Sequence, residues 1–285
     1  PITSSLPEEP KISSLIDSYK KEIDKEYLFA FNYHYGQVLT ETAFSLTEPD
    51  WDNCFDRARC MTSGIGDLVT DAFAYAVKKV EGDNYRDISL TLEGFGQIRV
   101  PIAKGSITVN DAMRLMALGI GPDDSRAGAA LVTFWLTGDE IKKVLELETT
   151  FAPIHYDMRL QIRGMRFSYD PKGQPLARIR KVEVEAPDGR WQLLEDNRLY
   201  RVCTDWKMLL MRPSLEQVSG GKIIFVPKDE TGKAIDDIKE TCVFVDVEKS
   251  LELKAWGALA LYLESFPQVP LEYRRAKINI TKIKE

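Results

Sequence analysis

The chain has 285 residues and a formal net charge of −6, and 44% of its residues are hydrophobic. This length allows one large domain or two small ones, and the composition is ordinary for a globular protein. The acidic balance argues against non-specific binding of nucleic acid, and no apolar run in the sequence approaches the length of a membrane span.

Histidine and cysteine usage argues against metal chemistry in this chain. A two-metal phosphoesterase needs several clustered His and Asp ligands, and the two histidines, His34 and His155, are far apart in sequence. None of the four cysteines belongs to a CxxC pair, so a structural zinc site is not expected. Cys54 and Cys60 are compatible either with a small disulfide loop or with buried free thiols. We therefore expect no metal or other cofactor within these residues.

The first part of the chain predicts a lead-in and one amphipathic helix. Residues 1–10 are rich in Ser, Pro and Glu, which favours a flexible segment. Apolar residues then recur at helical spacing over residues 11–25. The aromatic-rich run from Tyr27 to Ser45 predicts a strand or extended chain. We expect residues 1–48 to form a lead-in and linker, and residues 49–285 to form the main domain.

Two further helices have predicted N-terminal caps. An apolar stripe from Ile65 to Val80 has clear helical periodicity, and Thr62 or Ser63 is placed to cap it. A shorter helix should begin after Thr108, which forms an imperfect capping box with the acidic residue three positions later.

Residues Leu90 to Arg114 organise the candidate site. Alternating apolar residues over 87–92 predict a half-buried strand, and Gly94 and Gly96 follow at once. Glycine permits backbone angles closed to other residues and lets a ligand approach the main chain. Arg99 then offers a guanidinium suited to an anionic group. A tight turn beside a surface arginine fits the same residues.

The second half of the sequence mixes strands, hairpins and helices. A strand over 130–136 precedes a capping box at Thr137 and a helix through Glu148. The remaining predicted strands cover residues 165–169, 178–185, 222–226 and 241–247, and a final helix covers 251–263. These elements favour an α/β (α+β) mixed sheet with flanking helices.

Several motifs resemble the C-terminal domain of the 5'-nucleotidase family. Ile98-Arg99 and Gly105-Ser106-Ile107-Thr108 match at the family spacing, and Gly66 to Ala72 resembles its Gly-Asn-Leu-x-x-Asp-Ala, with Asp67 in place of Asn. Gln161 to Asp170 and Tyr200 to Trp206 resemble two further family segments. The resemblance runs from about Thr62 to about Asp205 and implies the fold of that domain.

The resemblance also implies substrate-binding positions. Arginines shortly before the Gly-Asn-Leu motif contact substrate in the family, and Arg57 and Arg59 are the nearest here, although two solvated arginines fit equally. Gly94, Gly96 and Arg99 correspond to its Asn-Gly-Gly-Gly-Ile-Arg run, which is altered here to Glu93-Gly-Phe-Gly-Gln-Ile-Arg.

Two positions correspond to the family's base-stacking residues. Leu118 takes the place of a phenylalanine, with loss of the stacking contribution of about 1 kcal/mol. Trp206 is the nearest aromatic residue to the second stacking position, although core packing is the commoner fate of a tryptophan.

The resemblance implies a substrate-recognition domain. In the family, a preceding metallophosphoesterase domain supplies the divalent metals and catalysis, and a helix like that over 11–25 joins the two; an ordinary amphipathic helix fits the same pattern. The expected partners are that domain and a nucleotide or phosphate-ester substrate, and the expected compartment is periplasmic or extracellular. A non-catalytic binding or packing module is the alternative. Independent carboxylate chemistry at Asp67, Glu93 or Asp205 is a third, which spacing does not favour.

Overall fold

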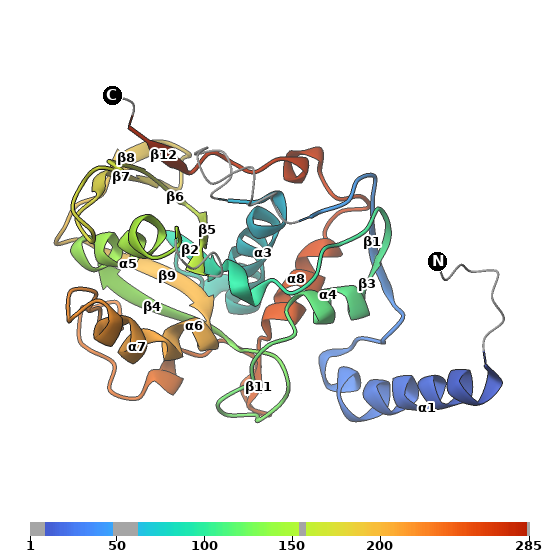
Figure 1. Cartoon of the computed structure of the whole chain (residues 1–285). Coiled ribbons are helices and arrows are strands. Elements are labelled where there is room, and N and C mark those ends of the chain that lie inside the picture. Colours follow the sequence, from blue (N-terminus) through green and yellow to red (C-terminus); the bar gives the residue numbers. More distant parts are fainter. Residues whose placement is uncertain (1–8, 48–61, 154–157, 284–285) are drawn as a thin grey trace.

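A four-stranded mixed sheet lies at the centre of the computed structural model, which describes residues 9–47, 62–153 and 158–283 (Figure 1). Its strand order is β4-β9-β2-β5. β9 runs parallel to β2 and antiparallel to β4, and β2 is antiparallel to β5. The four strands are Leu131–Thr137 (β4), Leu199–Asp205 (β9), Leu90–Gly94 (β2) and Leu160–Arg163 (β5).

A second four-stranded sheet, of order β12-β6-β7-β8, follows directly from the first. Gly164, at φ +81°, joins β5 to β6, and a Cβ there would lie 2.4 Å from the Ser89 carbonyl oxygen. A side chain is therefore excluded where the chain leaves one sheet for the other. The strands are Met165–Tyr169 (β6), Ile179–Glu185 (β7), Trp191–Leu193 (β8) and Ile280–Lys282 (β12).

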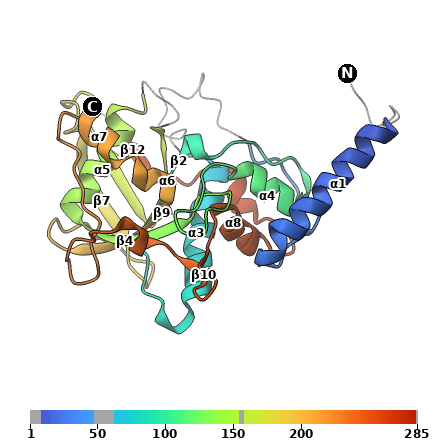
Figure 2. The same cartoon turned by 90° about the horizontal axis from the view of Figure 1, so that it is seen from below.

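Helices cover both faces of the central sheet. α3 packs on β2, β5 and β9 with α8 behind it, whereas α5 lies between β4 and the second sheet (Figures 1 and 2). The α-helices are Pro10–Glu26 (α1), Gly64–Glu81 (α3), Val109–Leu115 (α4), Gly138–Thr150 (α5), Trp206–Leu210 (α6), Arg212–Val218 (α7) and Ala255–Leu263 (α8). Single 3-10 turns cover Leu28–Phe31, Gly82–Asn84, Phe95–Gln97, Ile238–Thr241 and Leu271–Arg274.

The described residues form two hydrophobic cores, one on each face of the central sheet. The first joins α3, α4 and α8, and the second joins α5 to the facing strands of both sheets. Two small antiparallel ladders complete the fold. They pair Val38–Thr42 (β1) with Gly105–Thr108 (β3), and Phe244–Asp246 (β10) with Leu251–Glu252 (β11). The mixed α/β architecture expected from the sequence is confirmed.

Helix α1 differs from the other α-helices of the described chain because none of its residues is buried. It projects away from the body in Figure 2, and its apolar face, formed by Ile12, Leu15, Ile16 and Tyr19, is about half exposed. The next element, Leu28–Phe31, already belongs to the first core, where Leu28 is fully buried. Burial in the described chain thus begins at Leu28, and the domain boundary expected at residue 48 stays a prediction.

The aromatic run after α1, for which the composition predicts a strand or extended chain, does not form a single strand. Only β1 is a strand there, because the aromatic residues instead surround the buried Trp256. The rings of Tyr27, Phe31 and Tyr33 lie with centroids 5.2–5.9 Å from that of Trp256. The strand expected over 222–226 is also absent, since Ile223 and Phe225 are buried without entering a ladder. Both predicted capping boxes, at Thr108 and Thr137, are confirmed.

The start of α3 is fixed against the central sheet by a buried glutamine. Ser63 caps the helix, and its own backbone N–H and hydroxyl both donate to Oε1 of Gln161 on β5, at 2.9 and 3.0 Å. A Cβ on Gly66 would lie 1.9 Å from that Oε1, and a Cβ on Gly64 would lie 2.0 Å from the Tyr273 carbonyl oxygen. Both glycines are therefore required by close packing of the helix start on its neighbours.

Asp67 carries a buried carboxyl group in the first turn of α3. One oxygen accepts the Lys277 backbone N–H at 2.7 Å, and the other has no hydrogen-bond partner. Burial raises the pKa of Asp67 to about 7, despite the Lys277 hydrogen bond and charge. Its neighbour Asp71 instead lies in an ion-paired cluster with Arg163 and Lys277.

Among the described residues, no helix combines the length and apolar character needed to cross a bilayer.

Replacing Gly64 by alanine should lower the free energy of unfolding by about 1–3 kcal/mol, because the new methyl group has no room beside Tyr273. Chemical denaturation monitored by circular dichroism measures the change. Gly36→Ala is the matched control: nothing lies within 4 Å of the added Cβ, so its effect should stay within about 0.5 kcal/mol. Equal destabilisation by both variants would contradict the packing described for α3.

Asp67→Asn should remove a pH-dependent loss of stability. Between the ordinary pKa of 3.8 and the folded value of about 7, the native state keeps a proton that the unfolded chain has lost, so stability falls as pH rises. The variant should be more stable than the parent by at least ~1 kcal/mol at about pH 8 and nearly equal at about pH 4. Denaturation curves at the two pH values test this. Asp71→Asn, which breaks ion pairs, should instead destabilise at neutral pH.

Candidate functional site

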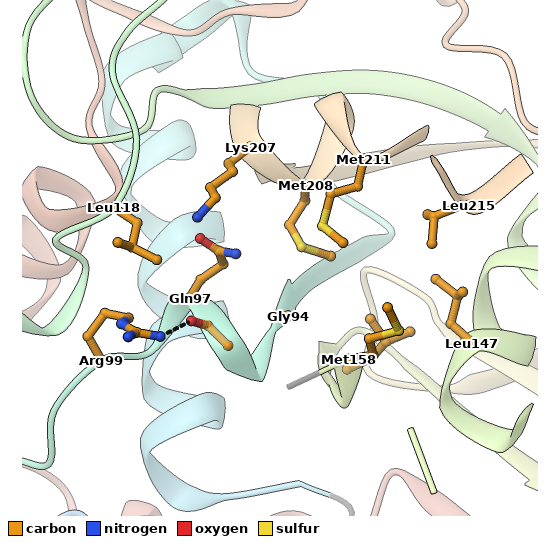
Figure 3. A pocket seen from close by; sticks show the side chains of 12 residues that line it. Gly94, Gln97, Arg99, Leu118, Leu147, Met158, Lys207, Met208, Met211 and Leu215 are labelled. Carbon is orange, nitrogen blue, oxygen red and sulfur yellow. Dashed lines mark hydrogen bonds between the residues drawn. The ribbon is translucent and has the colours of Figure 1, made fainter. Parts of the chain in front are cut away.

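A cavity of about 250 Å³ opens at the C-terminal end of β2, where the glycine-containing turn meets α5, α6 and α7 (Figure 3). Its volume is just below the ~300–1,000 Å³ of typical small-molecule pockets. Twelve residues line it: Gly94, Gly96, Gln97, Arg99, Leu118, Leu147, Met158, Leu160, Lys207, Met208, Met211 and Leu215.

The turn that follows β2 is held in place by main-chain hydrogen bonds. Phe95 is buried, and its N–H donates to the Arg159 carbonyl at 2.7 Å. The Arg99 N–H donates to the Leu115 carbonyl at 2.9 Å, which ties the turn to the end of α4. Gly94 has φ −72° and ψ 131°, which other residues also adopt. Its contribution at the cavity wall is thus the absence of a side chain, and the backbone freedom expected from the sequence is not used there.

One side of the cavity is polar. Arg99 is exposed and donates to the Gly96 carbonyl at 2.9 Å, and Lys207 is half-buried (Figure 3). Within the described residues, neither cation pairs with a carboxylate, and we call these two residues the cationic rim. Gln97, by contrast, is 8% exposed, and its Oε1 has no hydrogen-bond partner. The cavity therefore offers two cations and an unsatisfied acceptor.

The other side of the cavity is apolar. Met208, Met211 and Leu215 follow one another at spacings of three and four along α6 and α7, so they lie on one side and reach the cavity together. Leu147, Leu160 and Leu215 are nearly fully buried, and we call them the apolar floor. Figure 3 shows Leu147, Met158, Met211 and Leu215 on the side away from Arg99, whereas Leu118 lies beside Arg99 and Lys207.

A buried carboxyl group connects two segments that carry residues of the apolar floor. Glu148 on α5 accepts the Leu160 backbone N–H at 2.7 Å and pairs with Arg159 at 3.0 Å. Burial raises the pKa of Glu148 to about 8, although the Arg159 charge opposes this shift. The hydrogen bond from Leu160 joins α5 to the start of β5, which places Leu147 and Leu160 on the same wall.

Two further buried carboxyl groups lie at strand ends beside the cavity without lining it. Asp205 caps α6 by accepting the Met208 N–H at 2.7 Å, and Glu93 accepts the Gly94 N–H at 2.8 Å. Burial raises the pKa of Asp205 to about 6. Burial, and next the charge of Asp205, raises the pKa of Glu93 well above its ordinary value. Both groups serve the backbone around the turn, and neither is open to a ligand in the cavity.

Four of the seven residues proposed from the sequence meet at this cavity: Gly94, Gly96, Arg99 and Leu118. Trp206 does not line it. Its side chain packs in the second hydrophobic core, because the first turn of α6 directs Trp206 and Leu209 inward. Arg57 and Arg59 lie outside the described residues. The substrate-binding role of all seven stays a prediction.

Sequence reasoning did not include Lys207, Gln97 and the three methionines. A usable signal exists for the α6–α7 residues. Asp205 is an N-cap residue, so the helix begins at Trp206, and helical spacing then separates the side of Met208 and Met211 from that of Trp206 and Leu209. Gln97 and Met158 carry no such signal, because their positions depend on tertiary contacts between distant segments.

One group of potential metal ligands occurs in the described chain, away from this cavity. The ligand atoms of Asp123, Cys242 and Glu252 lie within 4.8 Å of one another. However, the Lys254 ammonium is 2.7 Å from Glu252 and the Lys239 ammonium is 3.3 Å from Asp123. Burial also raises the pKa of Cys242 to about 12, which keeps it a thiol. The group therefore does not fit the two-metal chemistry of a phosphoesterase.

Two curated proteins are similar to this chain in sequence. The chain is 22% identical over 205 residues to the trifunctional nucleotide phosphoesterase protein YfkN of Bacillus subtilis, covering 72% of this chain and 12% of that protein. It is 27% identical over 124 residues to the NAD 5'-nucleotidase of Haemophilus influenzae, covering 42% of this chain and 19% of that one. The chain thus spans less than a fifth of the length of these curated relatives.

Solved structures share the fold. The 5'-nucleotidase precursor of Thermus thermophilus superposes with a TM-score of 0.59 at 19% identity, covering 98% of this chain and 44% of that one. The NAD nucleotidase of Haemophilus influenzae gives 0.61 at 16% identity, covering 99% and 44%.

The sequence profile described as "5'-nucleotidase, C-terminal domain" matches residues 43–210. This match includes β2, the turn that carries Arg99, and α6. The chain therefore belongs to the 5'-nucleotidase C-terminal domain family.

Proposed function

We propose that this chain is the substrate-recognition domain of a 5'-nucleotidase-like metallophosphoesterase and binds a nucleotide or related phosphate ester in the cavity beside β2. The observation that carries the proposal is the cationic rim next to a buried, unsatisfied Gln97 acceptor, in a domain of this family. Guanidinium and ammonium groups bind phosphate through charge-assisted hydrogen bonds. The names of two relatives, a nucleotide phosphoesterase and an NAD 5'-nucleotidase, agree with this substrate class.

Catalysis belongs, in this proposal, to a preceding metallophosphoesterase domain that supplies the divalent metals. The exposed apolar face of α1 supports a partner on that side, because an unburied stripe of this kind is normally covered. Coverage of 44% of each related structure agrees with a domain of a larger protein. Recognition by one domain and chemistry by another would require the two to close around the substrate. The word precursor in the name of the Thermus protein agrees with export to a periplasmic or extracellular location.

A non-catalytic binding or packing module is the second candidate. Specific departures from the family pattern favour it. Glu93-Gly-Phe-Gly-Gln replaces the Asn-Gly-Gly-Gly run, and Leu118 replaces the stacking phenylalanine. On this alternative the cavity would be a remnant, and phosphate esters would not bind in a way that depends on Arg99.

Calorimetric titration of the purified chain with nucleoside monophosphates, sugar phosphates and alkyl phosphates separates the two candidates. We expect at least one ester to bind, and Arg99→Ala or Lys207→Ala to weaken binding about tenfold, because each removes a charged hydrogen-bond donor. Arg114→Ala is the control, since Arg114 is exposed in the last turn of α4 and does not line the cavity.

Two results would contradict the proposal. Absence of any Arg99-dependent binding would favour the packing module. Robust hydrolysis of phosphate esters by this chain alone, with added divalent metal, would show that catalysis does not need another domain.

A further inference from the structure

We propose that the ligand of this cavity is an aliphatic anion, a saturated apolar chain with a phosphate or carboxylate at one end, rather than a nucleoside with a stacked base. This inference rests on the proposed function, because it names the substrate class of the same cavity. It follows from how polarity, burial and hydrogen bonding are distributed over the lining residues.

Charge and burial change together from one side of the cavity to the other. Arg99 is exposed and Lys207 half-buried, so the positive charge is close to solvent. Leu147, Leu160 and Leu215 are only 4%, 1% and 5% exposed, so the apolar floor is the deep side. A ligand that satisfies both sides keeps its anionic group at the cationic rim and directs its apolar part inward. Figure 3 shows Arg99 and Lys207 on the side opposite to Leu147 and Leu215.

Four main-chain N–H groups on the apolar side of the cavity are already hydrogen-bonded within the protein, so they are not donors for the polar edge of a base. The Leu160 N–H is taken by Glu148 and the Met208 N–H by Asp205. The N–H groups of Met211 and Leu215 donate to the carbonyls of Met208 and Met211. A nucleobase inserted there would lose water from its ring nitrogens and exocyclic groups without replacement, which disfavours it. A saturated chain has no such groups.

The lining also lacks the flat surfaces that hold a base. None of the twelve lining residues is aromatic, and Trp206 packs in the core instead. Three of the twelve are methionines, Met158, Met208 and Met211, whose flexible thioethers adapt to irregular apolar shapes. Stacking needs rigid rings, whereas a flexible chain gains contacts from flexible side chains. The volume of about 250 Å³ also suits a slim ligand better than a base with its ribose.

The polar side can bind either of two anionic head groups. Two cations bind a phosphate or a carboxylate, and the unpartnered Oε1 of Gln97 accepts a hydrogen bond from a hydroxyl group on the ligand. A monoprotonated phosphate ester supplies both the charge and such a hydroxyl. Comparison of an alkyl phosphate with an alkyl carboxylate of equal chain length distinguishes the two head groups.

The test is calorimetric titration of the full chain with hexyl phosphate, hexanoate, adenosine monophosphate and inorganic phosphate. We expect hexyl phosphate or hexanoate to bind at least about tenfold more tightly than adenosine monophosphate and than inorganic phosphate. The excess over inorganic phosphate measures the contribution of the apolar part.

Two variants at half-buried positions assign that contribution to the cavity. Met211→Gln should weaken binding of the alkyl ligand at least about threefold and leave inorganic phosphate binding unchanged, because only the apolar wall is altered. Leu118→Phe should raise the affinity for adenosine monophosphate relative to the alkyl ligand, because it restores an aromatic ring at the family's stacking position. Thermal unfolding of both variants at the parent temperature confirms that they fold.

The outcomes separate this inference from the proposed function. If adenosine monophosphate binds as tightly as the alkyl ligands in an Arg99-dependent way, the aliphatic class is wrong and the proposed function stands. An affinity for the alkyl ligand that Met211→Gln does not change also overturns the inference. If no anion binds, both proposals fail.

Discussion

The contact between the start of α3 and the side chain of Gln161 holds the helix against the central sheet, next to the strand β2 whose C-terminal end lies at the cavity. Gln161 accepts two hydrogen bonds from Ser63, and the absence of a side chain on Gly66 lets the helix approach to that distance. β5, which carries Gln161, pairs directly with β2, so the same contact positions the end of β2 and the turn that follows it. Through β5 and β2, this contact is connected to the turn that carries Gln97 and Arg99 at the cavity.

Four carboxyl groups are buried in this part of the fold. Asp67, Glu93, Asp205 and Glu148 are all nearly fully buried, and burial raises the pKa of each. Each also accepts a backbone N–H: Asp67 from Lys277 before β12, Glu93 at the end of β2, Asp205 in the first turn of α6 and Glu148 at the start of β5. The buried acids thus fix chain ends and turns around the cavity. This explains their presence without any role in acid–base chemistry.

The sequence predicted the elements with local signals and missed those set by tertiary packing. The stripe that became α3, the two capping boxes and the helix expected over 11–25 are confirmed, because periodicity and caps are local properties. The aromatic run around Tyr33 has a composition that predicts a strand or extended chain, but it does not form one strand. Its rings pack instead on a tryptophan more than two hundred positions away. Residues 222–226 were misread for a similar reason, because burial of Ile223 and Phe225 does not need a ladder partner.

The candidate site divides in the same way. Gly94, Gly96, Arg99 and Leu118 were accessible from the family resemblance and do line one cavity. The sequence analysis named Trp206 as a site residue, whereas the cavity is lined by its neighbours Lys207, Met208 and Met211. The side that a short helix presents depends on where the helix begins. Asp205 sets that start by capping α6, and a shift of one residue exchanges a cavity residue for a core residue. With Met208 and Met211 at the cavity and Trp206 in the core, this wall of the cavity is aliphatic.

The most direct test of this account is a nuclear magnetic resonance titration of the chain labelled at its methionine methyl groups, with hexyl phosphate as ligand. Met158, Met208 and Met211 line the cavity, whereas Met116 and Met165 are buried in the two cores and act as internal references. The account predicts that the first three signals shift together with one saturation curve and that the two references stay in place. Shifts confined to the reference methionines, or no shift at saturating ligand, would contradict it.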